Sequence, residues 1–416
     1  MLEYSVGPVR YIVDPRSRTY SVEEPALSAE AAEAVKAIEE WLSLRGLEPE
    51  SDNIATAADH LGYSEVYQRE ATAIEYHVRR LMSGWGPLYP MVLDEGLEEA
   101  SVPRPGPVYV VHREVPGVYL ESSVILEREA LEDVIRELSV RAGISINPAY
   151  PIAEFDYGRA RVAAALGLVA STGPSLTVRL FPRQPYSLDQ LVELRLLSRV
   201  AAEYLRCLLL GGGMVFVTGA PGTGKTTLMA ALLDSLPDPD WKVVVVEETP
   251  EVRLRRRNWS SFHTREPRSL AEPERITITM EHLLKHALRL RPQVVAVAEA
   301  RFREVIYLFH AASLGVASAA TFHARSIEEL LRRLSLLGVP GELLDNLHAV
   351  VLLGIVDLPE GKRGRRMLAM WERWEGEFRL LWSWDPSTDS WETRGSPRRC
   401  RVSPPGQGAG SRGEAE

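Results

Sequence analysis

Long apolar runs are absent from this 416-residue sequence. A membrane-spanning helix needs about 18 or more consecutive apolar residues, whereas the best run here, at 349–356, is short and is followed by Asp357. We therefore predict that the chain does not span a membrane. Its first ten residues, MLEYSVGPVR, also lack a basic segment followed by an apolar stretch, so we expect no secretory signal and a cytoplasmic protein.

Cysteine is scarce as well. The two cysteines, Cys207 and Cys400, lie too far apart in the sequence to indicate a zinc knuckle or a local disulfide framework. Cys207 occurs in an apolar helical pattern and is expected simply to pack. The formal net charge of −9 argues against broad, non-specific binding of nucleic acid.

The remaining composition, with 45% hydrophobic and 25% charged residues, is that of a globular chain with room for two or three domains. Before about residue 187, strand-like runs and helical patterns at 28–46 and 127–143 indicate α+β structure. From Leu188 to about residue 384, apolar strand-length runs alternate with helical patterns, which predicts a parallel sheet covered on both faces. We predict four segments, namely an α+β segment at 1–70, an α+β domain at 71–187, an α/β domain at 188–395 and a disordered tail at 396–416.

Two clusters leave alternatives open. Four arginines at 253–257 precede Trp259, and such a run could face solvent, a neighbouring subunit or, least favoured, nucleic acid or anionic lipid. The tryptophans between 371 and 391 favour a C-terminal strand pair that turns at Gly376. Exposed tryptophans there could instead dock a partner.

A phosphate-binding motif follows the apolar run at 214–217. Residues 219–226 read GAPGTGKT, which fits the pattern G-x-x-x-x-G-K-[ST] and leads into a helical pattern. Backbone N–H groups of such a loop wrap round phosphate oxygens, while Lys225 neutralises the β and γ oxygens and the Thr226 hydroxyl ligates Mg²⁺. The candidate nucleotide-binding residues are Gly219, Ala220, Pro221, Gly222, Thr223, Gly224, Lys225, Thr226 and Thr227.

Carboxylates follow two of the expected strands. Glu247, Glu248 and Glu251 come after the run VVVV, and Glu299 comes after VVAVA. Ligands of open α/β sheets bind at the carboxyl ends of the strands. One carboxylate could hold Mg²⁺ through water and another could orient the attacking water.

On these residues the sequence resembles the archaeal branch of the type II/IV secretion ATPase superfamily, the motors of type IV pili, archaella and secretion systems. EETPEVRL with NWSSFHTR is similar to the acidic box of that family, and ITITMEHLLKHALRLRPQVVAVAEARFRE is similar to its Walker B region. ATFHARSIEELLRRL resembles the His box, and IEYHVRRLMSGWGPLYPMVLDEGLEEASV, SINPAYPIAEFDYGRARVAAALG and SLTVRLFP resemble the N-terminal domain. The resemblance covers about Tyr4 to Glu372.

The resemblance implies roles for matching positions. Lys225 and Thr226 would hold phosphate and Mg²⁺, together with Glu299 as the Walker B carboxylate. Glu247 would help to position water and His323 would sense the γ-phosphate. Three arginines would reach the nucleotide, often across a subunit boundary, and could equally be surface charges: Arg161, Arg179 and Arg265.

The resemblance also implies architecture and partners. We expect a RecA-like P-loop ATPase domain preceded by a smaller α+β domain, with ATP and Mg²⁺ as cofactors. A homohexamer would act beneath a polytopic membrane platform protein, at the inner face of the cell membrane, and would drive assembly or export of pilin-like subunits.

The chain departs from the family pattern at three places. Ala298 stands where the family usually has glycine before the Walker B glutamate, Phe302 replaces a second glycine, and the run 314–318 lacks the first histidine of the His box. Phe302 could narrow the phosphate site. These departures keep a second hypothesis open, namely that the chain is a nucleotide-binding regulatory or assembly subunit with weak hydrolysis. A third hypothesis, which does not depend on these departures, is a DNA-translocating ring ATPase.

Overall fold

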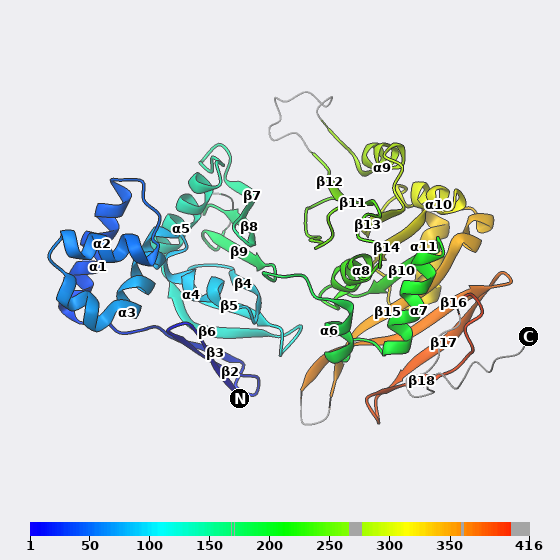
Figure 1. Cartoon of the computed structure of the whole chain (residues 1–416), viewed down its shortest axis with the longest axis horizontal. Helices are drawn as coiled ribbons and strands as arrows, with labels where there is room; N and C mark the ends of the chain where they lie inside the picture. Colours follow the sequence, from blue (N-terminus) through cyan, green and yellow to red (C-terminus); the bar gives the residue numbers. More distant parts are fainter. Residues whose placement is uncertain (168, 170, 266–276, 359–361, 401–416) are drawn as a thin grey trace, which may run out of the picture. The chain divides into compact units, whose positions relative to one another are not determined.

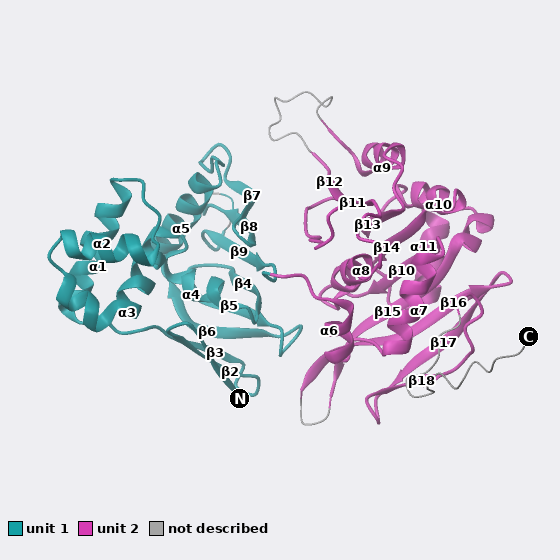
Figure 2. Cartoon of the chain, in the orientation of Figure 1, with its two compact units in different colours: residues 1–183 teal, residues 184–416 magenta. Residues whose placement is uncertain are grey.

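The chain folds into two compact units, Met1–Arg183 and Gln184–Glu416 (Figure 2). The computed structural model describes residues 1–167, 169, 171–265, 277–358 and 362–400. The boundary predicted at residue 70 does not separate two units, because strands from both sides of it pair in one sheet. No helix in the described part of the chain has both the length and the apolar character that a membrane span requires.

One nine-stranded sheet forms the framework of the first unit, with strand order β1-β2-β3-β6-β5-β4-β9-β8-β7 (Figure 1). The strands are β1 (Leu2–Val6), β2 (Val9–Asp14), β3 (Thr19–Glu23), β4 (Leu97–Val102), β5 (Gly106–His112), β6 (Tyr119–Leu126), β7 (Ile152–Tyr157), β8 (Ala160–Ala165) and β9 (Ser175–Leu180). Burial alternates along β8 and β9, so one face of these strands covers the core and the other presents the more exposed side chains.

The helices of this unit are α1 (Ala29–Ser43), α2 (Ser51–His60), α3 (Ser64–Met82), α4 (Tyr89–Leu93), α5 (Arg128–Arg141) and the 3₁₀ helix η1 (Gly86–Leu88). The first three share a separate core that includes Ile38, Ile54 and Ile74. The Ser28 hydroxyl accepts a hydrogen bond from the backbone N–H of Ala31 (3.2 Å), as an N-cap serine does. The predicted helical patterns at 28–46 and 127–143 are thereby confirmed as α1 and α5.

A second nine-stranded sheet, of order β12-β11-β13-β14-β10-β15-β16-β17-β18, forms the second unit. The strands are β10 (Met214–Gly219), β11 (Val243–Glu247), β12 (Trp259–His263), β13 (Val294–Ala300), β14 (Ala317–Phe322), β15 (Leu347–Asp357), β16 (Arg363–Trp374), β17 (Glu377–Asp385) and β18 (Ser390–Thr393). Pairing is parallel from β12 to β15 and antiparallel from β15 to β18. The predicted parallel sheet is therefore only part of a mixed sheet.

The helices of the second unit are α6 (Leu188–Glu193), α7 (Arg199–Leu210), α8 (Lys225–Asp234), α9 (Met280–Arg289), α10 (Val305–Ser313), α11 (Ile327–Leu336) and the 3₁₀ helix η3 (Gly341–Asn346). Along β10, Val215 and Val217 join the core beneath α7 and α8, whereas Met214 and Phe216 join the core beneath α9, α10 and α11. Successive side chains of a strand point to opposite faces. The prediction of helices on both faces is thus confirmed for the parallel strands.

The predicted tryptophan-rich strand pair is confirmed as β16 and β17. Glu375 and Gly376 join them, and both have positive φ (51° and 80°), as a two-residue turn of type I′ requires. The pair does not stand alone, because β16 also pairs with β15 and so continues the main sheet. Of the tail predicted to be disordered, residues 396–400 are described and 401–416 lie outside the described residues.

The expectation that Cys207 simply packs was wrong. Cys207 on α7 forms a disulfide with Cys400, across 193 positions of sequence and a Cα–Cα distance of 6.2 Å. Just before Cys400, the backbone N–H groups of Arg398 and Arg399 donate to the buried carboxylate of Glu372 on β16. Residues 398–400, at the end of the described chain, are therefore held to α7 by the disulfide and to β16 by hydrogen bonds to the buried carboxylate of Glu372.

Reduction of this disulfide should destabilise the second unit by about 2–5 kcal/mol, because the bond closes a very long loop in the unfolded chain. The measurement is urea unfolding of the full chain with and without dithiothreitol. The Cys207→Ser/Cys400→Ser variant should unfold at the lower urea concentration and should not respond to reductant. Equal midpoints for the oxidised and the reduced wild type would contradict this expectation.

Acid sensitivity is expected from Asp389, in the turn before β18. Arg366 donates to its carboxylate from Nε (2.7 Å) and Nη2 (2.9 Å), and Trp384 donates from Nε1 (2.9 Å). The Arg366 hydrogen bond is the largest cause that lowers the pKa of Asp389 to about 2, and burial opposes it. An unfolded aspartate titrates near 3.9, so this pair contributes up to about 2.5 kcal/mol above pH 4, which is lost as pH falls toward 2.

The matched variant is Asp389→Asn, because asparagine also tolerates the positive φ of this position (46°). It leaves Arg366, which is 5% exposed, without its anionic partner. At pH 7 the variant should therefore be about 3 kcal/mol less stable than the wild type. That difference should shrink between pH 4 and pH 2 in urea unfolding, and a difference that stays constant over this range would disprove the assignment.

Candidate functional site

The phosphate-binding loop joins the buried central strand β10 to α8. Its glycines at 219, 222 and 224 all have positive φ (148°, 74° and 93°). A Cβ at Gly219 would lie 2.5 Å from the backbone oxygen of Leu353, so glycine is required there, whereas a Cβ at Gly222 would meet no atom within 4 Å. The loop therefore bends tightly against the sheet and opens outward at Gly222.

Polar contacts hold the loop in this shape. The Thr223 hydroxyl donates to the backbone oxygen of Ala220 (2.8 Å), and Lys225 Nζ donates to the same oxygen (3.0 Å). Lys225 is the first residue of α8 and is only 7% exposed, and Thr226 follows it in the first turn. The N-terminus of a helix carries unpaired N–H groups and a partial positive charge, so this end of α8 suits an anion.

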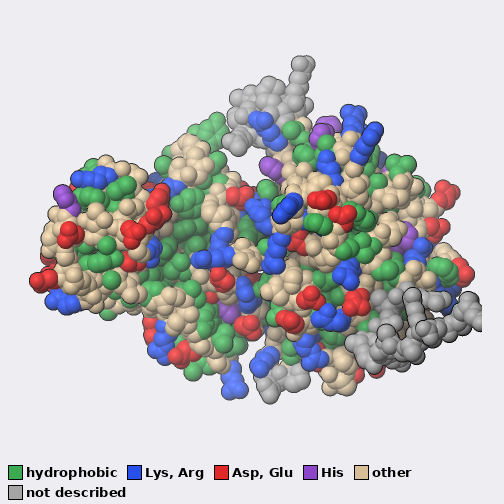
Figure 3. Space-filling model, in the orientation of Figure 1, with side chains coloured by type: hydrophobic (Ala, Val, Ile, Leu, Met, Phe, Trp, Pro, Cys, Tyr) green, Lys and Arg blue, Asp and Glu red, His purple; other side chains and the backbone are tan. Residues whose placement is uncertain are grey.

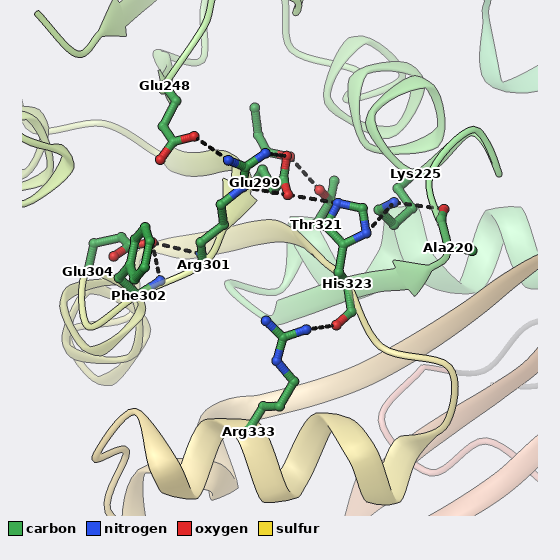
Figure 4. Close-up of polar contacts among 11 residues, drawn as sticks. Ala220, Lys225, Glu248, Glu299, Arg301, Phe302, Glu304, Thr321, His323 and Arg333 are labelled. Carbon is green, nitrogen blue, oxygen red and sulfur yellow. Dashed lines mark hydrogen bonds and ion pairs between the residues drawn. The ribbon is translucent and has the colours of Figure 1, made fainter. Parts of the chain in front are cut away.

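Glu299 reaches the loop from β13. The register between β13 and β14 shifts between Val297 and Ala300, and such a bulge re-aims the side chains within it. His323, just after β14, places Nε2 2.7 Å from Glu299 Oε1, and its Nδ1 lies 3.5 Å from Lys225 Nζ. Three residues predicted from separate segments, Lys225, Glu299 and His323, thus meet at the carboxyl ends of β10, β13 and β14 (Figure 4).

The charge states of this group follow from its surroundings. Burial raises the pKa of Glu299, but the Arg301 hydrogen bond and nearby positive charges outweigh it, so the pKa lies below its ordinary value. Burial, and after it the charge of Lys225, lower the pKa of His323. At neutral pH the carboxylate is ionised and the imidazole is neutral. We therefore assign Nε2 of His323 as the donor to Glu299 and Nδ1 as the acceptor that faces Lys225.

Glu247 is not brought to this group. Its side chain is fully buried at the end of β11, where it accepts hydrogen bonds from the backbone N–H groups of Glu251 (2.8 Å) and Val252 (2.9 Å) and from the Ser261 hydroxyl (2.6 Å). The next residue, Glu248, lies at the group instead, with Oε2 2.9 Å from Arg301 Nη1. Glu247 thus holds the loop that follows β11, and its expected role in positioning water stays a prediction.

Arg301 also belongs to this group, although no role for it was predicted from the sequence. Its Nε and Nη2 donate to the two oxygens of Glu299 (2.7 and 2.8 Å), while Nη1 contacts Glu248. An available signal was its position two residues after Glu299, at the end of the same strand. Phe302, expected to narrow the phosphate site, is 63% exposed and lies beside Glu304, on the far side of Arg301 from Lys225 (Figure 4).

The three predicted arginines come from other elements of the chain. Arg161 on β8 and Arg179 on β9 are direct cross-strand neighbours in the first unit, and Arg161 forms an ion pair with Asp156 (3.1 Å). Arg265 is exposed after β12 and pairs through its backbone with Ile278. Their predicted contacts with nucleotide remain predictions.

The basic run before Trp259 does not present a uniform charged surface. Arg256 is 8% exposed and donates to the backbone oxygens of Leu233 (2.7 Å) and Trp241 (3.3 Å). On the visible face of each unit, basic and acidic side chains are interspersed (Figure 3). Arg256 therefore packs within its own unit. The alternatives of contact with solvent, a neighbouring subunit, or nucleic acid or lipid apply only to the other arginines of the run.

Comparison with known proteins assigns the family. The model of the family described as "Type II/IV secretion system protein" matches residues 160–369, about half of the chain, including the phosphate-binding loop, Glu299 and His323. The chain belongs to this family. The family resemblance expected from the sequence is thereby confirmed.

The chain is also similar to two uncharacterized archaeal proteins. The chain is 32% identical over 330 residues to the uncharacterized protein MJ0900 of Methanocaldococcus jannaschii, covering 76% of this chain and 58% of that protein. It is 34% identical over 201 residues to MJ1287 of the same organism, covering 46% of this chain and 73% of that protein. The chain thus spans somewhat more than half the length of the first relative.

The fold matches that of the ATPase DotB from Legionella pneumophila, with a TM-score of 0.53 and 20% identity over 69% of this chain and 80% of that one. This likeness concerns the fold alone. It confirms the predicted fold class, an α/β RecA-like ATPase domain preceded by a smaller α+β domain.

Proposed function

We propose that the chain binds ATP with Mg²⁺ and hydrolyses it. The observation that carries this proposal is that Lys225, Glu299 and His323 meet at the carboxyl ends of three neighbouring strands, at the N-terminus of α8. Each comes from a different motif of the sequence. A phosphate loop alone would support binding, whereas a charged carboxylate beside its lysine also supports hydrolysis.

The residues fit this cofactor. The loop 219–227 would surround the phosphates with N–H groups, and Lys225 would meet the β and γ oxygens. Thr226 and Glu299 would hold Mg²⁺, the carboxylate acting through water. When bound, Mg²⁺ would neutralise charge that develops on the phosphate oxygens. The neutral imidazole of His323 can report on the γ-phosphate because it touches both Lys225 and Glu299.

We further propose that arginines of the first unit complete the site. Arg161 and Arg179 lie side by side on their sheet, and an arginine that approaches the γ-phosphate stabilises the charge of the transition state. Arg265 would act in the same way from the second unit. These arginines would come from the same chain or from a neighbouring copy in a homohexamer.

In the cell we propose a motor for a type IV pilus, archaellum or type II secretion-like machine. It would act at the inner face of the membrane, on a polytopic platform protein, and would drive assembly or export of pilin-like subunits. This proposal rests on the family, and on the sequence resemblance for the choice of cargo.

The test is phosphate release by the purified full chain with ATP and Mg²⁺, with and without lipid vesicles, together with equilibrium binding of ATP. Turnover that requires Mg²⁺ would support the motor. Tight ATP binding without turnover, even with vesicles, would favour the regulatory subunit. Strong, salt-dependent DNA binding would favour the translocating ring instead.

A further inference from the structure

Arg301 lies between two carboxylates that come from different strands. Its Nε and Nη2 donate to Glu299 Oε1 (2.7 Å) and Oε2 (2.8 Å), which is a bidentate pair, and its Nη1 lies 2.9 Å from Glu248 Oε2. Figure 4 shows the guanidinium plane between the two acidic side chains. A planar guanidinium is suited to such contacts because its donors point in fixed directions.

The contacts leave Glu299 with a defined acceptor. An ionised carboxylate offers about four lone-pair sites, two on each oxygen. Oε1 accepts from Arg301 Nε and from His323 Nε2, whereas Oε2 accepts from Arg301 Nη2. The remaining lone-pair site therefore lies on Oε2, and the rotation of the carboxylate is fixed by donors on both sides.

The backbone that carries Arg301 is itself held. The N–H groups of Arg301 and Phe302 both donate to Glu304 Oε1 (2.8 Å each), and Glu304 is only 6% exposed. This carboxylate closes the turn between β13 and α10. Arg301 thus projects from an anchored turn, although its own side chain is 47% exposed.

We propose that Arg301 is the positioning residue of this site, which holds Glu299 and Glu248 together as one unit and directs the Oε2 acceptor of Glu299 toward the water through which this carboxylate would hold Mg²⁺. This rests on the proposed hydrolysis. Arg301 would act through the two carboxylates and not through the nucleotide. Without the Arg301 side chain, the carboxylates of Glu248 and Glu299 would lie close to the bound triphosphate with no cation between them. The carboxylate of Glu299 would then be free to rotate.

The first arm of the test is steady-state kinetics of the full chain. Arg301→Gln should lower kcat about 10- to 100-fold, as loss of an orienting partner does, with the KM for ATP within about threefold of wild type. Arg301→Lys keeps the charge without the two parallel donors and should recover only part of kcat. In a Glu299→Gln background, Arg301→Gln should change kcat by less than about threefold, because its effect passes through Glu299.

The second arm measures Mn²⁺ binding without nucleotide, by electron paramagnetic resonance. Arg301→Gln removes the counter-charge of two adjacent carboxylates, so its affinity for Mn²⁺ should be about tenfold tighter than that of the wild type. The matched control is Arg199→Gln, since Arg199 is also 47% exposed and also binds a carboxylate, that of Asp189 (2.8 Å). The control should bind Mn²⁺ as the wild type does.

The outcomes separate the two proposals. Additive effects of Arg301→Gln and Glu299→Gln on kcat, or a large rise in KM, would overturn the positioning role. Unchanged Mn²⁺ affinity in Arg301→Gln would overturn it too. A wild type without turnover would refute the proposed hydrolysis, and the Mn²⁺ arm would still decide whether Arg301 governs the two carboxylates.

Discussion

Glu299→Gln is expected to lower kcat for ATP hydrolysis about 100- to 1,000-fold while ATP binding stays within about threefold of wild type. The amide keeps the shape of the side chain but removes its charge. It can accept from His323 or Arg301 through one oxygen only, so the acceptor on the second oxygen is lost. The measurement is phosphate release at saturating ATP and Mg²⁺, with affinity from a fluorescent ATP analogue.

Glu247→Gln is the matched control for this prediction. Its carboxylate is buried and accepts two backbone N–H groups and the Ser261 hydroxyl. The substitution should cost about 1–3 kcal/mol of unfolding free energy, because it disturbs buried hydrogen bonds. Its kcat should fall less than about tenfold. A large loss of kcat at unchanged stability would instead support the predicted water-positioning role of Glu247.

The phosphate loop could be predicted from the sequence because its residues are consecutive and because its glycines are required by the local backbone conformation. Gly219 must approach the backbone of β15, and Gly224 must adopt a positive φ at the start of α8. Glu299 could be predicted because parallel strands present their carboxyl ends at one edge of a sheet. His323, in contrast, was implied only by the resemblance of its segment to the His box of the family.

The choice between Glu247 and Glu248 could not be made in this way. Adjacent residues at a strand end point to opposite sides, so a shift of one position exchanges the buried carboxylate for the one at the site. Here the decision is made by the path of residues 251–252, whose N–H groups turn back to Glu247. That path depends on tertiary packing, which is not visible in the local pattern.

Contacts between segments far apart in the sequence could likewise not be predicted from the sequence pattern. Cys207 and Cys400 meet because α7 and the end of the described chain both lie against β16, where Tyr204 and Arg398 bind the same carboxylate of Glu372. Separation in the sequence is a poor guide to separation in space in a sheet whose first and last strands come from distant segments. The same reason explains why the sequence predicted the C-terminal strand pair but not its pairing with β15.

Lys225→Ala should weaken ATP binding about 100- to 1,000-fold, because the side chain supplies the one lysine charge of the loop and makes charge-assisted hydrogen bonds to phosphate. Turnover should fall with it. The ammonium group is already positioned in the protein, since the backbone oxygen of Ala220 accepts from it at 3.0 Å and its side chain is buried. Little conformational entropy therefore remains to be lost when phosphate binds.

Lys285→Ala is the control, because Lys285 is an exposed lysine that forms an ion pair with Glu281 (2.6 Å) on α9, away from the loop. Affinity is measured by titration with ATP and Mg²⁺, and unfolding in urea checks that both variants fold. Lys285→Ala should bind ATP as the wild type does. If Lys225→Ala also bound ATP within about threefold of wild type, the loop would not be the phosphate site. The roles of Glu299 and His323 in hydrolysis would then lose their basis, because both are inferred from their approach to Lys225.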